Sequence, residues 1–315
     1  MMAFNTIVDT SGLFPVITLA DSLSGTQAEI FSFGALLNKF SVKQSGNLVN
    51  IIDAFESPKE ALQDIRNGYK SAFLSPFTCR MNEGKYAFAQ KYYQVEKSFL
   101  GNHAIHGLTF DVIFTVDEAI STEESASVQL SYQYNRDDIG YPFRYSIVQV
   151  WKLEKGNKLS VATTVQHDNE HAIPYAQGWH PYFKLGATVD DCVFSFTTDK
   201  HVEFDDTLLP TGKTFVDSRF KSGILLKDIF LDNCFHLTES EGATCTLQNE
   251  ALKLTINPDA SYPYLQVYTP PHRKSIAIEN LSGAPDCFNN GLGLLTLPPN
   301  KPAHFSTTYT ITVLK

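Results

Sequence analysis

The chain has 315 residues, of which 43% are hydrophobic and 19% charged, so it can bury a sizeable core and is not expected to be globally disordered. Its formal net charge is -9 and its Lys and Arg residues do not cluster, which argues against a nucleic-acid partner or an anionic membrane surface. This balance fits a protein that binds a small neutral molecule.

The first element that the sequence predicts is a short helix. The segment Ser57-Pro58-Lys59-Glu60 supplies an N-cap serine, a proline at the first helical position and a glutamate placed to complete a capping box. Ala61, Leu62 and Ile65 are expected to form its apolar face. Gly68 is expected to end it. This pattern indicates a helix with a structural role.

Strand patterns dominate the rest of the chain. Hydrophobic residues alternate with polar or small ones over 128–134, 159–165 and 309–313, as in strands with one buried and one solvated face. The runs 145–151 and 264–268 are rich in β-branched and aromatic residues. Turn-forming residues separate such runs at four places: Asn135-Arg136-Asp137-Asp138, Gly156-Asn157, Pro210-Thr211-Gly212 and Pro270-Pro271. We therefore expect an all-β, mostly antiparallel sandwich or barrel, with few short helices and a single domain over 1–315.

The cysteines and the N-terminal residues indicate the cellular compartment in which the protein is expected. The five cysteines are scattered, odd in number and without C-x-x-C spacing: Cys79, Cys192, Cys234, Cys245 and Cys287. They are expected to be free thiols in a reducing compartment, which predicts a cytoplasmic protein. The first residues lack a basic segment followed by an apolar one, so no signal peptide is expected. No apolar run approaches the roughly 20 residues that a transmembrane helix needs.

Several polar residues lie in apolar surroundings. His180 stands in Gly178-Trp179-His180-Pro181-Tyr182-Phe183, where aromatic neighbours suit either a tuned acid/base beside a sugar ring or a core histidine held by one hydrogen bond. Glu279 lies at the end of a strand pattern, beside a loop. Such a carboxylate is either a general base or a solvated surface residue. Arg80 and Asp232 either bond each other as a salt bridge or bond sugar hydroxyls.

The histidines His103 and His106 are three residues apart, a spacing that on a helix could make a metal pair. Glycines flank the segment and it contains no Asp, Glu or Cys, so the three or four ligands of a metal site are missing. We therefore expect two loop histidines, one of which lines a site, and no metal.

Six short segments occur in a distinctive order: Cys79-Arg80-Met81; 102–107; 178–183; Leu209-Pro210-Thr211-Gly212; 231–235; and Ile278-Glu279-Asn280 followed by Gly283-Ala284-Pro285-Asp286. In order and approximate spacing, from about Ile17 to Val313, they resemble the aldose 1-epimerase family, also called galactose mutarotases. Each motif is weak alone, whereas six in the right order are specific. The resemblance implies a galactose-mutarotase-like β-supersandwich, in agreement with the strand patterns.

The resemblance also implies roles. Glu279 matches the general base that takes the proton from the C1 hydroxyl, and His180 matches the general acid that protonates the ring oxygen. His106 matches a second histidine at the sugar. Arg80 and Asp232 match residues that bond sugar hydroxyls. The reaction interconverts the α and β anomers of a free hexose such as glucose or galactose, and it requires no metal, nucleotide or other cofactor. The implied partner is the sugar, and the protein is expected to be a monomer or a homodimer.

The sequence departs from the family pattern at three positions. Cys79 replaces an Asn, Leu108 replaces a Gly and Asn233 replaces a His. These changes bear on sugar preference more than on the type of reaction. Two alternatives stay open. One is a hexose-6-phosphate epimerase, which would need a basic pocket, whereas the arginines are scattered along an acidic chain. The other is a non-catalytic carbohydrate-binding protein of the same fold.

Overall fold

The computed structural model describes residues 3–237 and 244–314. In this part of the chain, strands predominate and only two short α-helices occur, α1 (Pro58–Asp64) and α2 (Cys287–Asn290), together with two 3-10 turns, η1 (Asn82–Gly84) and η2 (Val189–Asp191). The all-β fold predicted from the alternating patterns is therefore confirmed.

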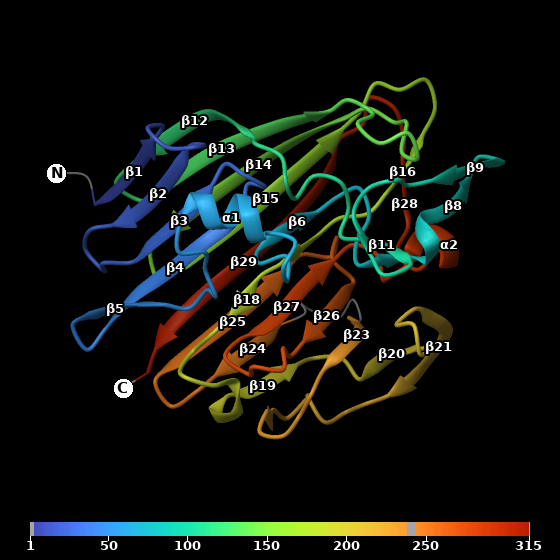
Figure 1. The fold of residues 1–315 in the computed structure, drawn as a ribbon. Helices are drawn as coiled ribbons and strands as arrows, with labels where there is room; N and C mark the ends of the chain where they lie inside the picture. Colours follow the sequence, from blue (N-terminus) through green and yellow to red (C-terminus); the bar gives the residue numbers. More distant parts are fainter. Residues whose placement is uncertain (1–2, 238–243, 315) are drawn as a thin grey trace.

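Two large antiparallel sheets form the body of the molecule (Figure 1). Among the described residues, the nine-stranded sheet has the order β12 (Thr115–Ser121), β13 (Ser125–Tyr134), β14 (Tyr145–Glu154), β15 (Lys158–Gln166), β29 (Ala303–Val313), β25 (Leu252–Pro258), β24 (Cys245–Gln248), β19 (Val193–Phe196) and β22 (Ile224–Leu225). The eight-stranded sheet has the order β21 (Pro210–Val216), β20 (Lys200–Phe204), β23 (Asp232–His236), β26 (Tyr264–Tyr268), β27 (Ile276–Leu281), β17 (Gly178–His180) and β6 (Ala72–Leu74), with β18 (Tyr182–Phe183) also paired to β27.

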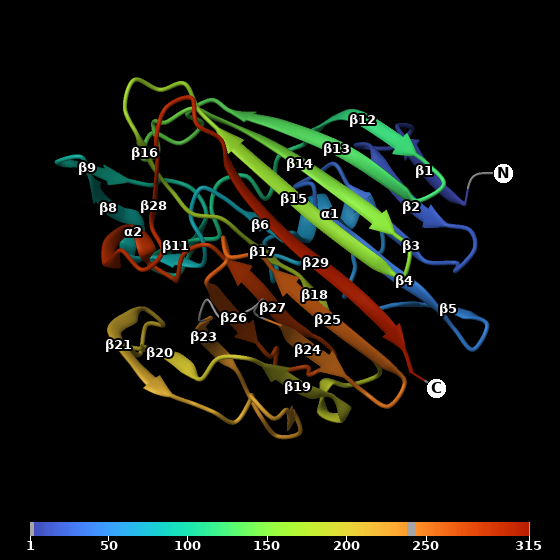
Figure 2. The same cartoon turned by 180° about the vertical axis from the view of Figure 1, so that it is seen from behind.

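Smaller sheets cover the body. In the described part of the chain, a five-stranded sheet contains β1 (Phe4–Asp9), β2 (Val16–Asp21), β3 (Gln27–Phe31), β4 (Leu37–Gln44) and β5 (Asn47–Asn50), and its first strand contacts β12 and β13. Three further groups are β10 (Phe99–Leu100) with β11 (His103–Ile105) and β7 (Arg80–Met81), β16 (Ile173–Tyr175) with β28 (Leu295–Leu297), and β8 (Lys85–Phe88) with β9 (Lys91–Gln94). Seen from behind, the nine-stranded sheet runs diagonally across the molecule and β8, β9 and α2 lie at one end (Figure 2).

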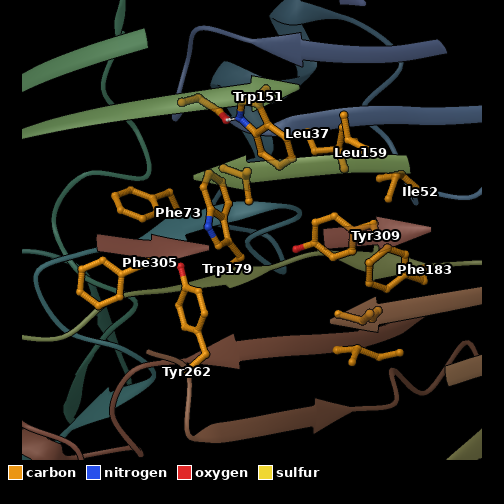
Figure 3. Close-up of a cluster of buried hydrophobic side chains, with 14 of the residues drawn as sticks. Leu37, Ile52, Phe73, Trp151, Leu159, Trp179, Phe183, Tyr262, Phe305 and Tyr309 are labelled. Carbon is orange, nitrogen blue, oxygen red and sulfur yellow. Dashed lines mark hydrogen bonds between the residues drawn. The ribbon is translucent and has the colours of Figure 1, made fainter. Parts of the chain in front are cut away.

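The main core lies between the two large sheets. Trp151 of β14 meets Trp179 of β17 with ring centroids 5.1 Å apart, and Phe183 of β18 meets Tyr309 of β29 at 5.8 Å (Figure 3). The Trp151 indole also donates a hydrogen bond to the Ala35 carbonyl at 3.0 Å, which ties in the loop between β3 and β4. Because successive side chains of a strand point to opposite faces, burial of Trp179 in this core turns His180 to the other face of the eight-stranded sheet.

The predicted strands agree with the observed ones, with one correction. Strands β13, β14, β15, β26 and β29 contain the segments expected from alternation or from β-branched and aromatic content. In contrast, Pro210-Thr211-Gly212 was expected as a turn, and it begins the edge strand β21 instead. An edge position explains the difference, since a proline at the first residue of an edge strand removes no ladder hydrogen bond.

The predicted helix is present but shorter than expected. The Ser57 side chain accepts a hydrogen bond from the Glu60 backbone N–H, as predicted, while the Glu60 carboxylate accepts one from Glu56 N–H. Leu62 is 41% exposed and does not share the apolar face of Ala61 and Ile65. It lies one residue after Ala61, and such neighbours do not face the same side of a helix.

The helix ends at Asp64 rather than at Gly68. A turn follows, in which Asn67 N–H bonds the Asp64 carbonyl, and Gly68 takes a left-handed conformation with φ of 94°. This turn directs the chain toward β6. No helix in the described part of the chain is long and apolar enough to cross a membrane.

Candidate active site

One row of side chains crosses four neighbouring strands of the eight-stranded sheet. Cys234 on β23 lies opposite Gln266 on β26, and Gln266 lies opposite Glu279 on β27. The Gly178–Leu281 pairing of β17 with β27, continued by two residues, places His180 opposite Glu279. Directly opposed residues point to the same face of a sheet, so these four side chains form a continuous row.

A second row lies two residues along the same strands. It consists of Asp232 on β23, Tyr268 on β26, Ala277 on β27 and Tyr182 on β18, paired in that order. Ala277 contributes only a methyl group between two tyrosines. The sheet face is therefore lowest at Ala277, with a tyrosine on each side.

A cavity of about 370 Å³ opens above these two rows. All five residues singled out in the sequence line it: Arg80, His106, His180, Asp232 and Glu279. Further walls come from Tyr69 at the end of the α1 turn and from Phe204 and Leu208 near β20. A concave pocket with apolar walls and a few convergent polar groups is typical of a small-molecule site.

The closest approach between ionisable groups in the cavity joins His180 to Glu279. The Nε2 atom of His180 lies 3.3 Å from Oε1 of Glu279, and the two residues are only 5% and 1% exposed. The expectation that Glu279 could be a solvated residue at a strand end is wrong, because all residues of β27 are buried. An acid/base pair held this close can serve two adjacent atoms of one ligand.

Burial shifts the pKa values of this pair in opposite directions. It raises the pKa of Glu279 well above its usual range, with a further rise from the Asp232 charge and an opposing effect of Arg80. It lowers the pKa of His180 to about 4. Although the 3.3 Å contact fits an ion pair, burial disfavours the charged form of each of the two groups, because both are desolvated. Glu279 is thus a strengthened base and His180 a strengthened acid.

His106 lies beside His180 on a constrained backbone. The rings of His106 and His180 are edge to face with centroids 4.8 Å apart, and burial lowers the pKa of His106 well below its usual value. The backbone of His106 is left-handed, with φ of 61°, and Gly107 follows with φ of 78°. A Cβ on Gly107 would lie 2.3 Å from the Ser75 carbonyl oxygen, so only glycine permits this approach.

Arg80 and Asp232 do not form a direct ion pair with each other among the described residues. The Asp232 carboxylate instead accepts a hydrogen bond from Gln266 Nε2 at 2.9 Å. The Gln266 Oε1 atom is buried and has no hydrogen-bond partner in the described part of the chain, and Gln266 lines the cavity. Gln266 is therefore a further polar residue of the cavity, which the sequence patterns missed because a glutamine within a strand gives no local signal.

Of the three departures from the family pattern, only Cys79 lines the cavity. Its Sγ lies 4.0 Å from Glu279 Oε2, and burial raises the pKa of the thiol, which keeps it a neutral neighbour of the carboxyl. Asn233 points to the other face of β23, where its side-chain amide lies 2.9 Å from His201 Nε2. Leu108 packs in the core.

His103 and His106 are separated by the structure. His103 lies on β11 and accepts a hydrogen bond from Glu83 N–H through Nδ1 at 3.1 Å, whereas His106 lines the cavity. No group of three or more His, Cys, Asp or Glu residues suited to a metal ion occurs in the described ranges. The two histidines therefore do not act as a pair.

Sequence comparison identifies relatives over most of the chain. Residues 15–310 match the family model described as aldose 1-epimerase. The uncharacterized protein YihR from Escherichia coli (strain K12) is 28% identical over 237 residues, which cover 73% of this chain and 75% of that protein.

Solved structures share the fold at low sequence identity. A GalM/aldose epimerase homologue from C. elegans has a TM-score of 0.82 at 22% identity, over 93% of this chain and 97% of that one. Galactose 1-epimerase from Lactobacillus acidophilus NCFM has a TM-score of 0.84 at 17% identity, over 100% of this chain and 100% of that one. These similarities confirm the galactose-mutarotase-like fold expected from the sequence.

Proposed function

The chain belongs to the aldose 1-epimerase family, and on this premise we propose that it interconverts the α and β anomers of a free hexose such as glucose or galactose. The observation that carries the proposal is the contact of 3.3 Å between His180 Nε2 and Glu279 Oε1 at the floor of a buried cavity. Anomer exchange needs a base at the C1 hydroxyl and an acid at the ring oxygen, and these two oxygens are attached to the same carbon.

In the proposed reaction, Glu279 accepts the proton of the C1 hydroxyl while His180 donates a proton to the ring oxygen. The bond between C1 and the ring oxygen breaks, C1 becomes the aldehyde carbon, and the ring oxygen becomes the C5 hydroxyl. Rotation about the C1–C2 bond turns the other face of the aldehyde toward the C5 hydroxyl. The two proton transfers then run in reverse, and the ring closes to the other anomer.

The opposite pKa shifts support these roles. The reactive form of the pair is the Glu279 carboxylate with the His180 imidazolium, which burial disfavours. Ring opening moves one proton onto Glu279 and one proton off His180, so both groups become neutral in the step that breaks the ring. Ring opening therefore removes two buried charges, and closure uses the same neutral pair as acid and base in exchanged roles.

A modest catalytic gain is sufficient for this reaction. Ring opening of a free sugar already occurs in water, and a positioned acid and a positioned base contribute roughly 10²–10⁴-fold each. The reaction is a proton transfer in both directions, so no electron or group carrier enters its balance. We accordingly propose a reaction that requires no cofactor.

The other polar groups of the cavity suit the binding of sugar hydroxyls. Asp232 and Gln266 lie on the side of Glu279 that faces β26 and β23, where they can accept bonds from ring hydroxyls. Arg80 and His106 line the same cavity from β7 and from the residue after β11. We propose that these four residues hold the pyranose while the acid/base pair acts on C1.

A hexose 6-phosphate is the second candidate substrate, because Arg66 lies at the cavity in addition to Arg80. The Arg66 guanidinium is bound to Asp111 at 2.8 Å, however, and Arg80 faces the Asp232 carboxylate in the same cavity. Both cations thus have an acidic neighbour, which favours a neutral sugar. A purely sugar-binding role would leave the buried pair of Glu279 and His180 without a purpose.

Polarimetry of freshly dissolved α-D-glucose and α-D-galactose tests the proposal. The protein is expected to accelerate the approach to the equilibrium rotation with at least one of the two sugars, in proportion to protein concentration. Glucose 6-phosphate is assayed in parallel, by coupling to a dehydrogenase specific for its β anomer. Rates equal to those of buffer alone with both free sugars would overturn the proposal, and acceleration of glucose 6-phosphate alone would establish the second candidate instead.

A further inference from the structure

The wall of the cavity beyond His180 is built by the turn that follows α1. The strands of the eight-stranded sheet run in the order β27, β17 and β6, and Tyr69 immediately precedes β6. Ser71 N–H donates to the His180 carbonyl at 3.0 Å, which fixes this turn to the strand of the proposed acid. Tyr69 and Glu279 therefore lie on opposite sides of His180.

Tyr69 presents a hydroxyl that has no protein partner in the described part of the chain. The residue is 6% exposed and lines the cavity, and its ring lies edge-on to His106 at 4.5 Å and to Phe110 at 5.2 Å. Two other buried tyrosines satisfy their hydroxyls internally: Tyr86 donates to the Gly140 carbonyl at 2.8 Å and Tyr141 to the Pro174 carbonyl at 2.6 Å. A hydroxyl without such a partner, on a residue that lines the cavity, is suited to a ligand.

The backbone holds Tyr69 in place at some conformational cost. Its φ is 54°, a left-handed value that is rare for an aromatic residue. Its N–H bonds the Ile65 carbonyl at 2.9 Å and its own carbonyl accepts from Ala72 N–H at 3.0 Å. Strained residues of this kind cluster at functional sites, where the surrounding structure maintains them.

The proposed reaction restricts the orientation of the sugar in the cavity. The C1 hydroxyl must contact Glu279 and the ring oxygen must contact His180, so the line between these two oxygens runs from β27 toward β17. The next atom after the ring oxygen is C5, which carries C6. An orientation that satisfies both contacts and directs the C6 substituent past His180 places that substituent on the side of the cavity lined by Tyr69.

We propose that Tyr69 determines the specificity of the site for C6, through a hydrogen bond between its hydroxyl and the C6 hydroxyl of a hexopyranose. This inference rests on the proposed function. It identifies the substrate class as aldohexoses with a free, uncharged C6 hydroxyl, in preference to 6-deoxyhexoses and pentoses. Arg66 does not change this class, since its guanidinium is held by Asp111 and lies 5.1 Å from the Phe110 ring centroid.

The test removes the hydroxyl from the protein and from the sugar separately. The value of kcat/KM is measured for glucose and 6-deoxyglucose, with the wild-type protein and with Tyr69→Phe. The wild type is expected to prefer glucose by about 3- to 10-fold, which corresponds to one hydrogen bond. Tyr69→Phe is expected to lose activity on glucose by the same factor, to keep its activity on 6-deoxyglucose, and so to show no preference.

Controls separate this result from other effects. Tyr92→Phe removes a hydroxyl from a residue that is 92% exposed and outside the cavity, and it is expected to behave as the wild type with both sugars. An equal loss with both sugars in Tyr69→Phe, or an unchanged preference for glucose, would overturn the inference while the proposed function stands. If the wild type accelerates galactose but not glucose, galactose and 6-deoxygalactose take their places in the same test. If it accelerates neither glucose nor galactose, the proposed function itself fails.

Discussion

His180 and Glu279 occupy opposed positions on neighbouring antiparallel strands, with His180 Nε2 and Glu279 Oε1 separated by 3.3 Å. Because this contact follows from the register of β17 on β27, it is a property of the sheet and not of a mobile loop. Both strands are buried, and Trp179, the neighbour of His180, is packed in the opposite core. The acid/base pair of the proposed reaction is thus placed by rigid elements.

The pH dependence of kcat/KM is expected to be bell-shaped with a broad plateau. The active pair holds one proton. Protonation of both groups blocks the base, and because burial lowers the pKa of His180 to about 4, the acidic limb is expected near that value. Loss of the shared proton removes the acid, and because burial raises the pKa of Glu279, the alkaline limb is expected well above the ordinary range of a carboxyl.

Initial rates of mutarotation measured across pH in non-catalytic buffers check this profile. The spontaneous rate at each pH is subtracted. A decline in activity centred near the ordinary histidine value of about 6.5 would contradict the assignment of His180 as a desolvated acid.

Gln266→Leu is expected to weaken sugar binding. The substitution removes the unpaired Oε1 acceptor and leaves Asp232 without its hydrogen bond from Nε2. A lost hydrogen bond and a half-buried carboxylate without its partner together cost about 1–3 kcal/mol, so kcat/KM is expected to fall about 5- to 150-fold, mainly through KM. Steady-state kinetics on the preferred sugar measure this effect.

Gln149→Leu is the matched control for that substitution. Gln149 is buried on β14, and its side-chain nitrogen and oxygen have no hydrogen-bond partner among the described residues. It does not line the cavity, so activity is expected to stay at the wild-type value. Equal activity losses in Gln149→Leu and Gln266→Leu would show that the loss has no relation to the cavity.

Gly107→Ala is expected to damage both the fold and the site. The new Cβ would lie 2.3 Å from the Ser75 carbonyl oxygen, and the backbone φ of 78° is unfavourable for alanine. Conformational strain and the clash together are expected to lower the free energy of unfolding by about 2–5 kcal/mol. Because His106 precedes this glycine, its displacement is expected to reduce kcat/KM by roughly 10²-fold in the protein that still folds.

The control for this variant is Gly46→Ala. Gly46 has a similar φ of 86°, but a Cβ there would meet no atom within 4 Å. Only the conformational cost of about 1–2 kcal/mol is expected, with unchanged activity. Urea denaturation of both variants measures the difference, and equal destabilisation would show that the close approach of Gly107 to Ser75 has no energetic importance.

The local sequence patterns predicted the strands well. The residues of the candidate site, in contrast, were identified only through the family resemblance. Alternation over 128–134 and 159–165 reports which face of a strand is buried, and β13 and β15 follow it. The pairing of Gln266 with Glu279 depends instead on a register between strands, which no period in the sequence records. For the same reason Gln266 escaped notice, although its strand was predicted.

The end of α1 and the start of β21 also depend on tertiary structure that local sequence patterns do not record. A glycine that follows a helical pattern signals a stop, but the chain here leaves the helix at Asp64 and uses Gly68 within the next turn. That turn brings Tyr69 to the cavity, where tertiary contacts with His106 and Phe110 maintain a left-handed aromatic residue. Pro210 similarly reads as a breaker, and its edge position makes it compatible with a strand.

The central claim is that Glu279 is the base of a mutarotation reaction, and a comparison of the wild type with Glu279→Gln tests it most directly. Polarimetry with equal amounts of folded protein follows the anomer of the preferred sugar to equilibrium. Glutamine keeps the size and the polarity of the side chain but cannot accept the proton, so the catalysed rate is expected to fall about 10²- to 10⁴-fold while the melting temperature is retained. A catalysed rate equal to that of the wild type would contradict the account.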